Sequence, residues 1–167
     1  MLQEQHTKPA GGETPHTEPR KDDDPLPVAE KPRRPSRLLV VEDAECTRRL
    51  ICALLGKMGV EADGAKNGQI ACEMAEKSKA EGKPYDLILM DIHMPQMSGY
   101  EATRRLREHG WEGPIVAVTA YTENGEECLA AGCDGHLAKP ITEAALRNAV
   151  ERHLHAMPVS QWAKAAG

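Results

Sequence analysis

The sequence predicts an α/β fold in which helices cover both faces of a doubly wound parallel sheet. Five short apolar segments alternate along the chain with segments whose apolar residues recur every three or four positions. The first pattern is typical of buried strands and the second of amphipathic helices. Strands that alternate with helices pair in parallel, because each helix carries the chain back across the sheet. Both faces are then covered, which explains why the strands are apolar almost throughout.

The predicted domain occupies residues 37–156 of the 167 residues in the chain. Residues 1–36 contain seven of the twelve prolines and very few apolar side chains. Such a composition cannot offset the entropy of an ordered chain, so we expect a disordered, Pro-rich tail or linker. Residues 157–167 are expected to form a C-terminal tail.

The first half of the domain is predicted to contain two strands and two helices. In chain order they occupy residues 37–42, 44–58, 60–65 and a helix that starts near 68 and fades after 77. Gly59 ends the first helix, and Asn67-Gly68 marks the turn into the second. The apolar positions of that second helix are predicted to be Ile70, Cys72, Met74 and Ala75.

The second half is predicted to contain three strands that alternate with three helices. In chain order they occupy residues 85–91, 98–107, 115–119, 123–131, 135–138 and 142–155. Ser98 and Thr142 stand directly before helical patterns. Their hydroxyl oxygens can accept hydrogen bonds from the first helical turn, so both are predicted N-caps.

Composition excludes several classes of function. The net charge is −5 and no basic stripe is present, so a direct nucleic-acid partner is not expected. The apolar runs are too short for membrane insertion, and no signal peptide opens the chain. The five cysteines are odd in number and form no CxxC pair, so we expect thiols in a cytoplasmic protein.

Polar residues stand where the predicted strands end. The first strand ends at Glu42 and Asp43, the third at Asp91, the fourth at Thr119 and the fifth at Lys139. The carboxyl ends of parallel strands share one edge of the sheet, where ligands bind in open α/β folds. We therefore expect three carboxylates, one hydroxyl and one ammonium group to meet there.

The chemistry of this set indicates phosphoryl transfer. Three neighbouring carboxylates repel one another unless a cation joins them, and Mg²⁺ prefers such oxygen ligands, with Mn²⁺ as an alternative. Lysine and threonine side chains suit phosphoryl oxygens. An aspartate carboxylate can act as the nucleophile and form an acyl phosphate.

Four motifs resemble the receiver domains of response regulators in two-component phosphorelays. They are Val40-Val-Glu-Asp, Met90-Asp-Ile-His-Met-Pro-Gln-Met-Ser-Gly-Tyr, Pro114-Ile-Val-Ala-Val-Thr-Ala and Ala138-Lys-Pro. The text around Asp91 is most similar to receivers of hybrid sensor histidine kinases. The resemblance implies a flavodoxin-like sheet with strand order 2-1-3-4-5. It also implies that phosphorylation switches the face formed by the fourth helix, fifth strand and fifth helix.

The resemblance implies a role for each matching residue. Asp91 accepts a phosphoryl group from a phosphohistidine, and the metal ligands are Glu42, Asp43, Asp91 and the backbone carbonyl of His93. Glu42 stands where many receivers carry aspartate, and it is expected to reach the metal directly or through water. The phosphate-binding and switch positions are Thr119, Ala120, Lys139 and His136. The structural positions are Pro95, Gly99 and Pro140, with a cis bond expected between Lys139 and Pro140.

Two departures from the family pattern are visible. His136 stands where the family usually has an aromatic residue that swings inward when the threonine moves, and an imidazole can also acquire charge near neutral pH. His93 and Tyr121, two positions after Asp91 and Thr119, flank the path of attacking water. We expect their bulk to slow loss of the phosphoryl group.

Several alternatives stay open on the sequence. A phosphatase on the related aspartate-nucleophile plan would need a second aspartate at position 93, where this chain has histidine. A second alternative is a receiver-like module that binds partners without being phosphorylated. A third is a flavin-binding relative of the flavodoxins.

The resemblance also implies the partners. They are a histidine kinase or a histidine phosphotransfer domain, with a homodimer through the fourth helix, fifth strand and fifth helix as a further option. No enzymatic activity is expected beyond self-phosphotransfer and slow autodephosphorylation. The chain is either a stand-alone regulator or the terminal receiver of a hybrid kinase.

Overall fold

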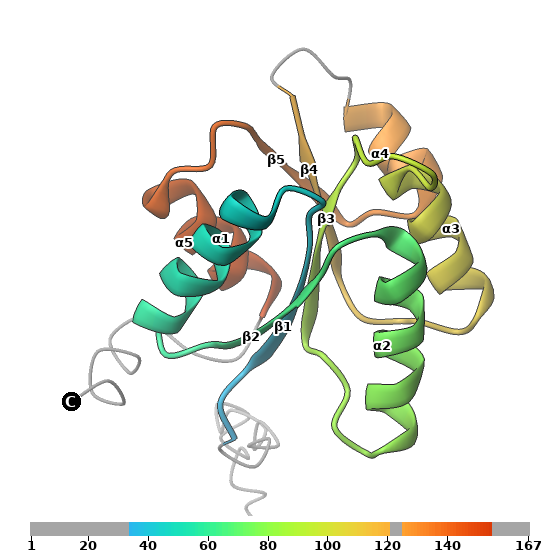
Figure 1. The fold of residues 1–167 in the computed structure, drawn as a ribbon, viewed down its shortest axis with the longest axis horizontal. Coiled ribbons are helices and arrows are strands. Elements are labelled where there is room, and N and C mark those ends of the chain that lie inside the picture. Colours follow the sequence, from blue (N-terminus) through green and yellow to red (C-terminus); the bar gives the residue numbers. More distant parts are fainter. Residues whose placement is uncertain (1–33, 121–124, 155–167) are drawn as a thin grey trace, which may run out of the picture. The chain divides into compact units, whose positions relative to one another are not determined.

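The computed structural model describes residues 34–120 and 125–154 of the chain. Within them five strands alternate with five helices (Figure 1). The strands are β1 (Arg37–Val41), β2 (Glu61–Ala65), β3 (Leu87–Asp91), β4 (Ile115–Thr119) and β5 (Gly135–Ala138). The helices are α1 (Glu45–Lys57), α2 (Gly68–Ala80), α3 (Gly99–Glu108), α4 (Gly125–Ala131) and α5 (Glu143–His153). Residues 1–33 of the predicted N-terminal tail, the predicted C-terminal tail, residues 123–124 of the fourth predicted helix and residue 155 of the fifth lie outside the described residues.

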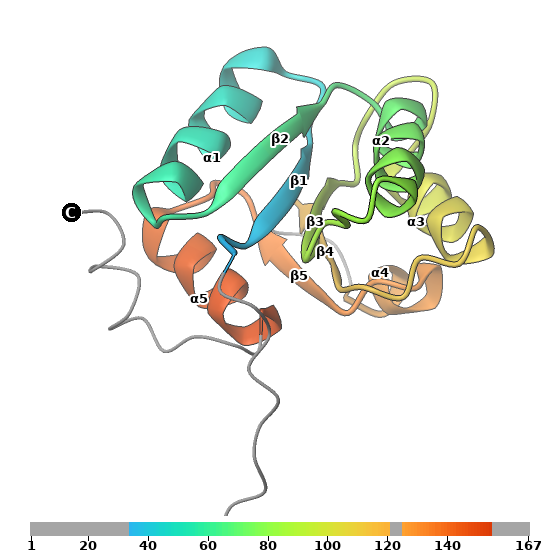
Figure 2. The ribbon, with the colours of Figure 1, turned by 90° about the horizontal axis from the view of Figure 1, so that it is seen from below.

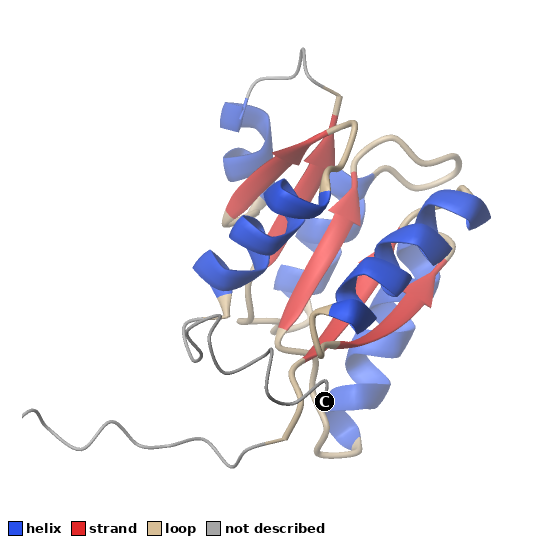
Figure 3. Cartoon of the chain, turned by 90° about the vertical axis from the view of Figure 1, so that its left-hand side faces the viewer, coloured by secondary structure: helices blue, strands red, loops and turns tan. Residues whose placement is uncertain are grey.

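The five strands form one parallel sheet in the order β2-β1-β3-β4-β5. Figure 3 shows the strand arrows pointing the same way. Helices α1 and α5 cover one face of the sheet, and α2, α3 and α4 cover the other (Figure 2). The doubly wound fold and the strand order are therefore confirmed.

The core divides into two clusters because successive side chains of a strand point to opposite faces. Leu39, Ile88 and Met90 face α2, α3 and α4, whereas Leu38 and Leu89 face α1 and α5. Strand β3 is buried along its whole length. The carboxylate of Asp91 therefore stands at the end of a strand that is enclosed on both faces.

Helix starts follow the predicted caps. The Ser98 hydroxyl accepts a hydrogen bond from the Glu101 amide, and the Glu101 carboxylate accepts one from the Ser98 amide, which completes a capping box. The Thr142 hydroxyl likewise accepts from the Ala145 amide at the start of α5. Helix α2 differs from the prediction, because it continues through Lys77 as far as Ala80. Its buried Ser78 satisfies its hydroxyl by donating to the Ala75 carbonyl, so the polar sequence stays helical.

Ordered structure precedes the predicted boundary at Arg37. The Arg34 guanidinium lies 3.0 Å from the Asp86 carboxylate, and the Glu61 amide donates to the Ser36 carbonyl. The Arg37 guanidinium lies 2.8 Å from the Asp63 carboxylate and 4.8 Å from the centre of the Tyr85 ring. These contacts tie the entrance of β1 to the start of β3, at the edge of the sheet opposite to the carboxyl ends.

No helix among the described residues is both long and apolar enough to span a membrane.

Candidate functional site

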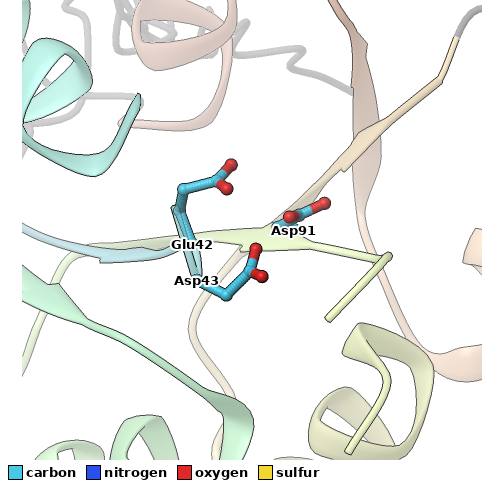
Figure 4. A group of neighbouring side chains, drawn as sticks. All are labelled: Glu42, Asp43 and Asp91. Carbon is cyan, nitrogen blue, oxygen red and sulfur yellow. The ribbon is translucent and has the colours of Figure 1, made fainter. Parts of the chain in front are cut away.

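Three carboxylates meet at the carboxyl ends of β1 and β3. Val41 of β1 pairs with Met90 of β3, so the residues that follow each strand emerge side by side. One oxygen from each of Glu42, Asp43 and Asp91 lies within 4.8 Å of the other two (Figure 4). Glu42 and Asp91 are buried, with 3% and 2% of their surface exposed, whereas Asp43 is exposed. The predicted meeting of carboxylates at this edge is therefore observed.

Lys139 brings an ammonium group to the same place from the end of β5. Its Nζ atom lies 3.1 Å from Glu42 Oε2 and 3.2 Å from Asp91 Oδ2. The Lys139 amide donates to the Thr119 carbonyl, and the peptide bond between Lys139 and Pro140 is cis, as predicted. One ammonium group thus bridges the two buried carboxylates.

The charges at this site do not balance. Burial raises the pKa of Glu42, and the charge of Asp91 adds to that effect, although the hydrogen bond from Lys139 opposes it. Burial acts to lower the pKa of Lys139, but its contacts with Glu42 and Asp91 outweigh burial and raise it. Three carboxylates face one ammonium group, and a divalent cation would supply the missing positive charge. The oxygen donors of Glu42, Asp43 and Asp91 therefore fit Mg²⁺.

His93 lies beside Asp91, with an exposed side chain. Its backbone amide donates a hydrogen bond to Asp91 Oδ1 over 3.2 Å, which helps to hold the carboxylate in place. Its role as a carbonyl ligand to the metal stays a prediction.

Two further predicted phosphate-site residues, Thr119 and Ala120, lie at the end of β4 and directly after it. Thr119 is buried and pairs with Ala138 of β5, which places it beside the strand that leads to Lys139. Ala120 is exposed. Tyr121 lies outside the described residues.

His136, the predicted switch residue, has an exposed side chain on β5. Its ring packs against the start of α4, because a Cβ atom added to Gly125 would lie 3.1 Å from the imidazole Cε1. The absence of a side chain at Gly125 therefore leaves room for the ring in its outward position.

Gly99 allows the loop after Asp91 to fold back on the strand. A Cβ atom at this position would lie 2.2 Å from the Asp91 carbonyl oxygen, and the Gly99 amide donates to the Ile92 carbonyl. Within the loop, the Met97 amide donates to the Pro95 carbonyl, and Gln96 adopts a φ of 72°. This left-handed conformation is uncommon for residues other than glycine.

Arg48 is a contributor that the sequence analysis missed. From α1 its guanidinium donates to the Glu42 carbonyl over 2.7 Å and to the Asp43 carbonyl over 3.3 Å. Both bonds fix the backbone that presents the two carboxylates. The only signal in the sequence is an arginine one helical turn beyond them.

A groove next to Lys139 was also missed. It has a volume of about 550 Å³, and we call it the α1–β5 groove. It is lined by Thr47, Leu50, Ile51, Leu54, Ala120, Lys139, Pro140 and Ile141. Leu50 is 58% exposed, although most leucines of the domain are buried. An apolar surface therefore adjoins the charged site.

Comparison with known proteins supplies the context for this geometry. Residues 38–151 match the model of the response regulator receiver domain. The chain belongs to the receiver domain family. Receivers act as phosphoacceptors in two-component signal transduction, and this is the function of the family to which the chain belongs.

The chain spans only a small part of the length of the curated relatives that it matches. It is 40% identical over 126 residues to hybrid signal transduction histidine kinase G of Dictyostelium discoideum; the match covers 70% of this chain but 4% of that protein. Signal transduction histidine-protein kinase BarA of Escherichia coli K12 is 36% identical over 132 residues, which are 77% of this chain and 14% of BarA.

The whole of one solved receiver domain matches the fold of this chain. It is the receiver domain of a sensor histidine kinase from Pseudomonas aeruginosa PAO1, described with a magnesium ion coordinated in its active-site cleft. The two share 35% identity and a TM-score of 0.64, over 74% of this chain and 100% of the other.

Proposed function

We propose that Asp91 is the phosphoacceptor of this receiver domain. Its carboxylate ends the fully buried strand β3, lies 3.2 Å from Lys139 Nζ and accepts a hydrogen bond from the His93 amide. Asp43 is exposed and Glu42 is engaged by Lys139 and by the Ala44 amide. The assignment rests on the place of Asp91 at the end of the central strand β3, where its carboxylate meets those of Glu42 and Asp43 and lies 3.2 Å from Lys139 Nζ.

The proposed transfer moves one phosphoryl group from nitrogen to oxygen. An Asp91 carboxylate oxygen attacks phosphorus, the bond between phosphorus and the donor imidazole breaks, and the imidazole nitrogen takes up a proton from solvent. Lys139 and Thr119 would contact the phosphoryl oxygens, with the backbone at Ala120 beside them. Glu42, Asp43, Asp91 and the His93 carbonyl would hold Mg²⁺ or Mn²⁺, which supplies positive charge for the transferred group.

We further propose a route by which the signal leaves the site. Movement of Thr119 toward a phosphoryl group would open space for the imidazole of His136, which lies exposed against the start of α4. The surface of α4, β5 and α5 would change as a result, and this surface is the proposed site for a downstream partner or a second copy of the chain.

The phosphodonor is proposed to be a histidine kinase or a histidine phosphotransfer domain. The α1–β5 groove supports this proposal, because its apolar lining reaches Lys139 and could receive a helix that carries the donor histidine. We propose residues 37–156 as the functional domain and residues 1–36 and 157–167 as flanking segments. Self-phosphotransfer and slow autodephosphorylation are proposed as the only chemistry. A cytoplasmic location is proposed as well, and the thiol state of all five cysteines supports it.

Labelling by acetyl phosphate in the presence of Mg²⁺ tests the assignment of Asp91. The Asp91→Asn variant is expected to lose the label completely, because an amide oxygen cannot form the acyl phosphate. Asp86→Asn is the matched control, since Asp86 lies at the opposite edge of the sheet and its amide could still accept from the Arg37 backbone. Full stoichiometric labelling of Asp91→Asn would refute the assignment.

The lifetime of the label tests the proposed role of His93 and Tyr121. Replacement of both by small polar residues should speed loss of the acyl phosphate by about tenfold, because attacking water would gain access. The decay of the label after removal of acetyl phosphate measures this rate. A decay rate equal to that of the original protein would contradict the role.

A further inference from the structure

Helix α4 ends in a turn that brings two cysteines together. Gly132 has a φ of 103°, its amide donates to the Leu129 carbonyl, and the Cys133 amide donates to the Cys128 carbonyl over 2.9 Å. This pair of hydrogen bonds defines a Schellman motif. In that motif the side chains three positions before and two positions after the end of the helix frequently contact each other. Here both of these side chains are thiols.

Both thiols face the same side of α3. The Tyr100 hydroxyl lies 3.9 Å from Cys128 Sγ, and the Thr103 hydroxyl lies 3.7 Å from Cys133 Sγ. Tyr100 and Thr103 are three positions apart on one helix and are therefore neighbours on its surface. Cys128 is 1% exposed and Cys133 4% exposed, and both belong to the same core cluster. The two thiols also interact with each other, because Cys128 adds to the effect of burial in raising the pKa of Cys133.

The backbone separation also suits a covalent bond between them. The hydrogen bond from the Cys133 amide to the Cys128 carbonyl holds the two residues' backbones next to each other. Disulfides span Cα separations of about 4.4 to 6.8 Å. We propose that Cys128 and Cys133 form a site of oxidative modification, in which the two thiols close to an intramolecular disulfide.

The reaction needs a two-electron oxidant, and a peroxide is the class we assign. One thiolate attacks a peroxide oxygen and becomes a sulfenic acid while hydroxide leaves and takes up a proton to form water. The second thiolate attacks the sulfenic sulfur, the disulfide forms as the sulfur–oxygen bond breaks, and the departing hydroxide takes up a proton to form a second water. Two thiols and one hydrogen peroxide thereby give one disulfide and two waters.

Burial controls the rate of this modification. Burial raises the pKa of Cys133, so little thiolate is present while α4 rests on α3. Helix α4 has only seven residues, and short elements with few packed turns open most readily. Oxidation of this pair is therefore expected to be slower than that of an exposed thiol. Exposed Cys46 is expected to react with peroxide first and serves as an internal reference.

The disulfide would covalently fix the turn between α4 and β5. It does not depend on the identity of the phosphoacceptor, and it is measured without any phosphate donor. Failure of this proposal would therefore be distinguishable from failure of the Asp91 assignment.

Peptide mapping of the full chain after exposure to hydrogen peroxide tests the proposal. Tryptic cleavage is disfavoured between Lys139 and Pro140, so residues 108–147 form one peptide that contains Cys128 and Cys133, no other cysteine and no methionine. After alkylation in denaturant this peptide is expected to lack both alkyl groups and to be lighter by two hydrogen atoms than the reduced peptide. Reduction before alkylation should restore both alkyl groups.

Three variants separate the proposed pairing from general oxidation. Cys128→Ala and Cys133→Ala should each abolish the loss of two hydrogen atoms, whereas Cys72→Ala, which removes another buried thiol, should retain it. If either alanine variant fails to fold, the mapping of the original chain still decides the question. Complete alkylation of both cysteines after Cys46 has been fully oxidised would overturn the proposal, as would a cross-link from either of them to Cys72.

Discussion

Lys139 is the residue that makes the buried carboxylates compatible with the fold. Two carboxylates that are each about 97% removed from solvent would repel each other strongly in the low dielectric of the interior. A lysine supplies a compact charge with three donors, and its Nζ reaches both carboxylates at once. Arg48 completes the arrangement from the backbone side by holding the carbonyls of Glu42 and Asp43.

Tyr85 provides a pH prediction away from the candidate site. Burial and the hydrogen bond to Asp63 raise the pKa of Tyr85 from 10.0 to about 12. The unfolded chain therefore loses this proton first as pH rises. The free energy of unfolding should fall by roughly 2 to 3 kcal/mol between about pH 10 and 12 from Tyr85 alone. Below about pH 10 this contribution is fully present.

The measurement is urea denaturation across that pH range for the original protein and for Tyr85→Phe. Phenylalanine cannot ionise, so the variant should lack this part of the pH dependence. Tyr100→Phe is the control and should keep it. Equal slopes for the original protein and Tyr85→Phe would contradict the raised pKa.

The polar residues of the candidate site were predictable from the sequence. The contacts that hold their backbone in place were not. Glu42, Asp43, Asp91 and Lys139 each follow an apolar strand, and parallel strands end at one edge, so sequence order alone places them together. Arg48 supports the site by holding the backbone carbonyls of Glu42 and Asp43, and Gln96 shapes the loop after Asp91 through its left-handed backbone conformation. A guanidinium on a helix or a glutamine in a loop carries no signal for such a role until the three-dimensional path is known.

Among the secondary-structure elements, α3 depends most on a single small residue. Its first residue, Gly99, stands so close to the Asp91 carbonyl that a Cβ atom has no space, and the atoms that it would meet belong to backbone. Gly99→Ala should therefore lower the free energy of unfolding by about 2 to 3 kcal/mol, although alanine favours helices. Urea denaturation measures the loss.

Gly56 in α1 is the matched control for this prediction. No atom lies within 4 Å of a Cβ atom added there, so Gly56→Ala should raise stability by about 0.5 to 1 kcal/mol through helix propensity. A stability loss of equal size in both variants would show that the close approach at Gly99 is not the cause.

Sequence patterns predicted the positions of the strands but not the end of helix α2. Strand positions were predictable because all five strands are short and bounded by turn residues. The end of α2 was not, because Lys77, Ser78 and Lys79 read as a polar loop while the fold buries one face of that segment. Tertiary packing overrides local propensity in such a segment.

For the domain as a whole, the two exposed leucines of the described residues offer a test of how the donor docks. Leu50 lines the α1–β5 groove and is 58% exposed, whereas Leu129 lies on α4 and is 62% exposed. Leu50→Asp should slow transfer from a phosphorylated histidine phosphotransfer domain by about tenfold or more, because an apolar contact at the centre of an interface is lost. Transfer from acetyl phosphate should be unchanged.

Leu129→Asp is the control, since it adds the same charge at similar exposure on another surface. Its transfer rates should match those of the original protein with both donors. Equal slowing by the two leucine variants would mean that the donor does not use the groove.

The ion pair between Glu42 and Lys139 joins residues that are 97 positions apart in the sequence. Contacts between such distant residues form late in folding, because the intervening chain must first be closed into a loop. Until β5 has docked, the carboxylates at the ends of β1 and β3 have no ammonium group beside them. Competence to receive a phosphoryl group should therefore arise only when the last strand is in place. An incompletely synthesised or partly unfolded chain would therefore not accept phosphoryl groups, and it would not compete with folded receivers for the phosphodonor.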